Sequence, residues 1–101
     1  MTLRDILLKG GHVLDPRNGR DCLSDVLVKD GKIAGIGNNI ESAAVSVIDV
    51  SNMYVVPGLV DLHTHTFGYR ASTSPDEYAF PHGVTTMVDA GGSGYKTFER
   101  F

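Results

Sequence analysis

The sequence predicts a mostly-β chain in two parts, a small β-domain over residues 1–56 and the start of a parallel-stranded unit over residues 57–101. The first part holds about five or six short apolar stretches separated by turn-forming residues, which is typical of a small sandwich or barrel-like β-domain. Pro57-Gly58 then interrupts this pattern. The second part follows the order strand, short helix, strand, which indicates a βαβ unit.

The composition is that of an ordinary globular chain. The 101 residues are 42% hydrophobic and 21% charged, with a formal net charge of −3. No basic run is present, so nucleic acid is not an expected partner. No apolar run reaches the roughly 20 residues of a membrane helix, and the charged N-terminus does not fit a secretory signal. Cys22 is the single cysteine, and a cytoplasmic protein without disulfides is expected.

The clearest element of the first part is a hairpin around Asp30-Gly31. Apolar-rich stretches lead into and out of this dipeptide, and a two-residue Asp-Gly loop favours a type I′ turn. The alternation breaks near Gly35, so a β-bulge is expected there. The other expected strands cover residues 6–8, 12–14, 45–50 and 53–56, with a turn at residues 15–19.

The second part opens with an apolar run at residues 59–63, which is typical of a buried parallel strand. Ser74 as N-cap and Pro75 at the first helical position predict a helix that Pro81 cuts short. The β-branched residues within 83–90 predict a second strand. Two strands and one short helix cannot cover their own faces, so the chain is expected to be the N-terminal segment of a longer protein.

Two histidines carry the main functional pattern. His63 and His65 end the apolar run, and because side chains alternate along a strand, both are expected on one face. Neutral imidazoles bind zinc at about 2.0–2.1 Å, and two of them supply half of a tetrahedral site. The alternative is chance, since the chain contains four histidines. The pair therefore predicts a metal whose other ligands come from elsewhere.

The stretch Pro-Gly-Leu-Val-Asp-Leu-His-Thr-His at residues 57–65 resembles the metal-binding opening of the amidohydrolase superfamily. Residues 14–16, 25–33 and 48–50 are similar to the β-sandwich segment that precedes the barrel in dihydroorotase-like and deacetylase-like members. Residues 83–91 resemble their second barrel strand. The similarity runs in order along nearly the whole chain.

This resemblance implies a fold, a cofactor and a reaction. The complete protein is expected to be a (β/α)8 TIM-type barrel carrying a β-sandwich, with His63 and His65 at the C-terminal end of the first barrel strand. They would hold a divalent metal, with zinc expected, in a centre of one or two ions. The resemblance places the remaining ligands, including an aspartate that acts as general base, beyond residue 101. The implied reaction is hydrolysis of an amide or ester bond in a small molecule, with this segment inactive alone.

One position departs from the family pattern. Dihydroorotases usually carry an arginine two residues after the second histidine, where this chain has Phe67, which disfavours dihydroorotase itself. The run at residues 89–94, together with residues 97–98, resembles the deacetylase-like branch instead. Arg70 and Asp89 are the remaining candidates for substrate binding. Their alternatives are a solvated loop charge for Arg70 and a cap on the Gly-Gly turn for Asp89. Asp61 is expected to be a satisfied buried aspartate, with a metal ligand as the alternative.

Two other hypotheses stay open on the sequence. The segment acts alone as a β-rich binding or assembly module with vestigial histidines, or it associates with a separately supplied remainder of its own barrel. A homo-oligomer is a further option for its assembly. A well-folded chain without metal would favour the stand-alone module. A complex heavier than the chain would favour association with a separately supplied remainder of the barrel.

Overall fold

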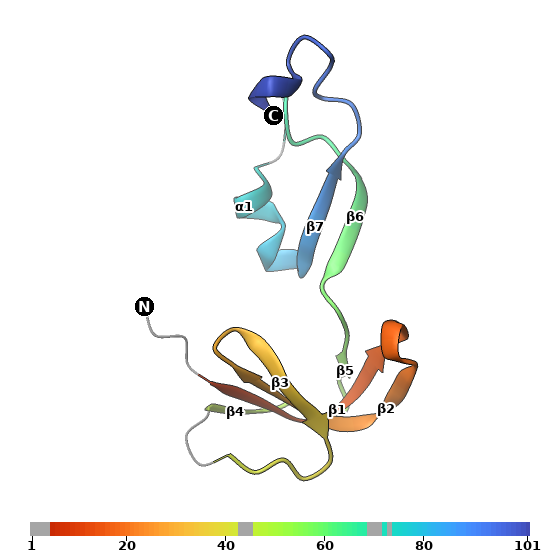
Figure 1. Cartoon of the computed structure of the whole chain (residues 1–101), viewed down its shortest axis with the longest axis vertical. Helices are drawn as coiled ribbons and strands as arrows, with labels where there is room; N and C mark the ends of the chain where they lie inside the picture. Colours follow the sequence, from red (N-terminus) through yellow and green to blue (C-terminus); the bar gives the residue numbers. More distant parts are fainter. Residues whose placement is uncertain (1–4, 43–45, 69–71, 73) are drawn as a thin grey trace. The chain divides into compact units, whose positions relative to one another are not determined.

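The computed structural model describes residues 5–42, 46–68, 72 and 74–101. The chain is mostly β with one short α-helix, as the sequence predicted (Figure 1). It divides into two compact units, Met1–Pro57 and Gly58–Phe101. The assignment of these units to a sandwich portion and a barrel start stays a prediction. Over the described ranges, no helix has the length and apolar character needed to cross a membrane.

The first unit is a single five-stranded sheet with the order β3-β2-β1-β4, and β5 also pairs with β1. Its strands are β1 (Ile6–Asp15), β2 (Arg20–Lys29), β3 (Lys32–Gly37), β4 (Ser46–Asp49) and β5 (Tyr54–Val55). The pairs β1–β2 and β2–β3 are antiparallel, whereas β4 and β5 run parallel to β1, one after the other along the same edge. One such sheet fits a portion of a β-sandwich.

The predicted hairpin is confirmed. Asp30 and Gly31 have φ values of 49° and 73°, and a type I′ turn requires positive φ at both central residues. The register of β2 against β3 passes over Ala34. The expected bulge therefore lies directly beside Gly35.

The prediction of two short strands around Gly10-Gly11 is wrong, because β1 is continuous through these glycines. Lys9 and Gly10 together lie opposite Asp25 of β2, where the register shifts. Gly10 has a φ of 76° and donates its N–H to Asp25 Oδ1 at 2.9 Å. The extra residue is thus absorbed in a β-bulge that bends the strand without ending it.

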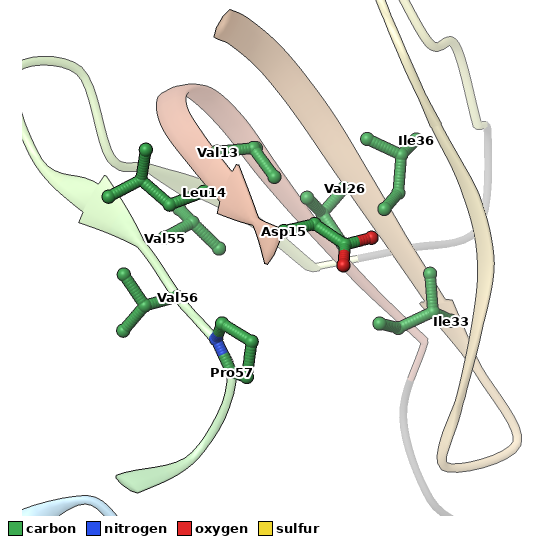
Figure 2. Close-up of a pocket in the computed structure, with 9 residues that line it drawn as sticks. All are labelled: Val13, Leu14, Asp15, Val26, Ile33, Ile36, Val55, Val56 and Pro57. Carbon is green, nitrogen blue, oxygen red and sulfur yellow. The ribbon is translucent and has the colours of Figure 1, made fainter. Parts of the chain in front are cut away.

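Mostly apolar side chains surround a hollow in this unit (Figure 2). Val13 and Val26 are each 4% exposed and come from neighbouring strands. The hollow beside them is lined by Val13, Leu14, Asp15, Val26, Ile33, Ile36, Val55, Val56 and Pro57. The apolar part of the unit therefore gathers where β1, β2, β3 and β5 approach one another.

The second unit contains the predicted βαβ order. The strands β6 (Leu59–Thr64) and β7 (Val84–Asp89) pair in parallel. The helix α1 (Pro75–Tyr78) is followed by the 3-10 turns η2 (Phe80–His82) and, after β7, η3 (Phe98–Arg100). Pro75 begins α1, and the helix ends before Pro81, as expected. Ser74 has the extended backbone of an N-cap, although its side chain makes no capping hydrogen bond.

The burial predicted for β6 is not found within this unit. Leu59, Val60 and Leu62 are exposed by 54%, 55% and 73%. In β6, Thr64 alone is buried. The reason is that a two-stranded sheet with one short helix has too few neighbours to cover both of its faces.

Candidate functional site

The two predicted metal ligands lie close together at the C-terminal end of β6. The ring centroids of His63 and His65 are 5.4 Å apart, with their planes at 88°. Both side chains are exposed. Since imidazole nitrogens bind zinc at about 2.0–2.1 Å, two rings on one tetrahedral ion have centroids about 5 Å apart. The observed pair therefore fits two ligands of one divalent metal.

The pairing of β6 with β7 fixes the main chain between these histidines. Thr64 is buried, its hydroxyl donates to the carbonyl oxygen of Val88 at 3.1 Å, and its own carbonyl oxygen accepts from the N–H of Ala90 at 2.8 Å. Asp61 Oδ1 accepts from the backbone N–H of His63 at 3.1 Å. Asp61 thus has the partner that was expected, but its predicted burial is wrong within this unit, where the side chain is partly exposed.

The other two histidines have local partners. His12 Nε2 lies 2.5 Å from Asp21 Oδ1, and His82 Nδ1 lies 2.8 Å from the carbonyl oxygen of Tyr78. In the part of the chain that the structure describes, no three or more His, Cys, Asp or Glu side chains form a group able to hold a metal ion. The role of His63 and His65 as two ligands of one metal stays a prediction.

Asp89 ends β7 and joins the two loops at this edge of the sheet. Its Oδ2 accepts from the N–H of Thr66 at 2.9 Å, from the Thr66 hydroxyl at 3.1 Å and from the N–H of Phe67 at 3.2 Å. Its Oδ1 accepts from Gly91 and Gly92 at 3.0 and 2.6 Å. The predicted cap on the Gly-Gly turn is present. The hydrogen bonds from Thr66 to Asp89 are a contact that the sequence did not indicate.

These hydrogen bonds also control the charge of Asp89. The N–H of Thr66 lowers the pKa of this carboxyl most; partial burial raises it, and the Gly92 and Gly91 N–H groups and the Thr66 hydroxyl lower it further. The net pKa lies well below the ordinary value. Asp89 is therefore an ionised acceptor at neutral pH and not a proton donor.

The two loops meet backbone to backbone. A Cβ on Gly92 would lie 1.7 Å from the carbonyl oxygen of Phe67, and one on Gly68 would lie 2.4 Å from the carbonyl oxygen of Gly92. Gly68 also has a φ of 81°. An Asp followed by glycines indicates a turn from sequence alone, but the contact between these loops depends on the pairing of β6 with β7.

The position that departs from the dihydroorotase pattern is apolar and half-buried. The Phe67 ring makes an edge contact with the Phe101 ring, with centroids 5.7 Å apart. Arg70, the other candidate for substrate binding, lies outside the described residues. Its predicted role stays a prediction.

The chain is similar to amidohydrolases in sequence and in fold. A dihydroorotase of Elusimicrobium minutum (strain Pei191) is 48% identical over 59 residues, which cover 58% of this chain and 14% of that protein. The crystal structure of a dihydroorotase matches 96% of this chain and 26% of its own, with a TM-score of 0.81 and 34% identity. The crystal structure of an amidohydrolase matches 95% of this chain and 28% of its own, with a TM-score of 0.65 and 30% identity. No family model matches the chain.

The β-rich fold and these similarities place the chain in the amidohydrolase superfamily, where it corresponds to an N-terminal segment. The chain spans less than a third of each of the three proteins compared above. Within the superfamily, dihydroorotases are the proteins that it resembles in both comparisons.

Proposed function

We propose that the complete protein hydrolyses an amide or ester bond of a small molecule with the help of a divalent metal, and that His63 and His65 supply two of the metal ligands. The observation that carries this proposal is the pair of imidazoles, 5.4 Å apart between centroids, at the carboxyl end of β6. Carbon–nitrogen bonds are the favoured target, because the similar proteins are dihydroorotases and an amidohydrolase.

The chain's own residues would bind and orient. Two neutral imidazoles suit zinc, which is the expected metal, as one or two ions. When bound, such a metal lowers the pKa of water and polarises a carbonyl group. Thr64 and Asp61 hold the main chain of the ligand pair through the hydrogen bonds given above. The general base, an aspartate by resemblance to the family, would come from outside the described residues.

The exposed apolar residues of β6 support the proposed (β/α)8 barrel. Val60 and Leu62 occupy alternate positions on the same strand face and are 55% and 73% exposed. Further barrel strands and helices would cover this surface. We propose that the rest of the barrel is the partner of this segment, and that the segment alone is inactive because it presents half a set of metal ligands.

The substrate proposal follows from Phe67. An apolar, half-buried ring at this position gives no positive charge for a substrate carboxylate. This favours an acyl group on an amide or ester, as in the deacetylase-like branch, over dihydroorotate.

A cytoplasmic location is proposed as well, because Cys22 is an exposed free thiol, which suits a reducing compartment.

The test replaces both proposed ligands in the complete natural protein. We expect His63→Ala/His65→Ala to lose the bound metal, measured by inductively coupled plasma mass spectrometry, and to lose hydrolysis of amide substrates. His82→Ala is the matched control, since this histidine bonds locally to Tyr78. Unchanged metal content and hydrolysis in the double variant would contradict the proposal. Turnover by the purified 101-residue chain would contradict the proposed inactivity of the segment.

A further inference from the structure

The main chain on both sides of His65 is held by the end of β7. On one side, Thr64 bonds to the carbonyl oxygen of Val88 and the N–H of Ala90. On the other side, Thr66 donates both its N–H and its hydroxyl to Asp89. Three consecutive residues of one strand end thus determine the path of the chain through the second candidate ligand.

Asp89 does more than cap its own turn. The cap on Gly91 and Gly92 uses Oδ1, whereas Oδ2 accepts three hydrogen bonds from Thr66 and Phe67 of the other loop. The contact of Gly92 with the Phe67 carbonyl leaves no room for a side chain between the loops. The carboxylate therefore acts as the link between two closely packed backbones.

We propose that Asp89 is a positioning residue, which fixes Thr66 so that the His65 imidazole stays directed toward the same metal ion as His63. This inference rests on the proposed metal site. It assigns Asp89 a role different from substrate binding, because both carboxylate oxygens are occupied by donors from the protein. Asparagine cannot replace it, since one oxygen would become an NH2 group facing N–H donors.

The test measures metal binding instead of turnover. Zn²⁺ is titrated against a competing chelator, and the visible spectrum of the Co²⁺ form is recorded, for the complete natural protein and for Asp89→Asn. We expect zinc affinity to fall about ten-fold, the lower end of the range for residues that orient metal ligands, and the Co²⁺ bands to shift. Asp49→Asn is the control, because Asp49 Oδ1 accepts from the Ser51 N–H at 2.9 Å in the first unit.

A zinc affinity and Co²⁺ spectrum of Asp89→Asn equal to those of the wild type would overturn the inference. The proposed function fails separately, if the wild type itself binds no zinc or if His63→Ala/His65→Ala binds it unchanged. If Asp89→Asn loses its folded circular dichroism spectrum, the inference is tested with Thr66→Val instead. It removes the hydroxyl donor alone, and we expect zinc affinity to fall about three-fold.

The matched control for this milder variant is Thr97→Val, whose hydroxyl bonds to the backbone of Gly94. We expect Thr97→Val to bind zinc like the wild type. Equal zinc affinity and Co²⁺ spectra in Thr66→Val and Thr97→Val would overturn the inference.

Discussion

Replacing Asp25 with alanine tests how the bulge in β1 stabilises the first unit. Asp25 is 5% exposed and accepts from the N–H groups of Gly10 at 2.9 Å and Ile40 at 3.0 Å. Lys9 Nζ lies 3.4 Å from the same carboxylate. In Asp25→Ala both backbone donors lose their acceptor, and each unsatisfied buried group costs roughly 1–3 kcal/mol.

Because these two donors are partly buried, we expect the free energy of unfolding to fall by about 2–4 kcal/mol. That is a large part of the about 5–15 kcal/mol that stabilises a typical domain. The measurement is urea unfolding followed by circular dichroism at pH 7, together with amide hydrogen exchange at Gly10 and Ile40. Both amides should exchange faster in the variant.

The control is Asp21→Ala, whose side chain is 74% exposed. We expect it to change the free energy of unfolding by less than about 0.5 kcal/mol. Wild-type unfolding midpoints and wild-type exchange rates in Asp25→Ala would refute the argument that the bulge depends on this carboxylate.

Two further predictions concern the same unit. Burial raises the pKa of Asp25, but its two backbone N–H donors and the nearby lysine lower it more, so the net pKa lies below the ordinary value. The stabilisation by the ionised Asp25 is therefore complete above the unfolded pKa of about 3.9 and is lost as the pH falls through the folded pKa. In an acid titration, the free energy of unfolding of Asp25→Asn should fall less steeply below about pH 4 than that of the wild type. Parallel curves of unfolding free energy against pH would argue against this. Gly31→Ala should lower the free energy of unfolding in urea by about 1 kcal/mol, because the φ of Gly31 is 73°. Gly37→Ala should lower it less, because nothing lies within 4 Å of a Cβ added at Gly37. Equal losses in the two variants would contradict the turn assignment.

The hairpin and the proximity of the His63 and His65 rings could be predicted from local sequence. Asp30-Gly31 determines its own turn, because few residue pairs tolerate two positive φ values in succession. The spacing of His63 and His65 places both on one face through strand alternation alone. Both features depend on residues within a few positions of each other, so no distant partner is needed to form them.

The continuous β1 and the role of Asp89 required the tertiary structure. Glycines at positions 10 and 11 indicate a break when read locally, but pairing with β2 along the full length and the Asp25 acceptor convert the break into a bulge. The parallel placement of β4 and β5 along β1 is likewise a pairing between distant segments. Local pattern does not determine which strand edge such segments select.

By itself, the sequence determined that this chain is mostly β, that a turn divides β2 from β3, and that two imidazoles end an apolar strand. The tertiary structure decided which polar groups hold the main chain around those imidazoles. The donors to Asp89 include Thr66 and Phe67, more than twenty residues earlier in the chain, and they meet it only after β6 and β7 pair. The register of β6 against β7 therefore determines which donors reach the Asp89 carboxylate, and burial and backbone pairing fix that register across the unit.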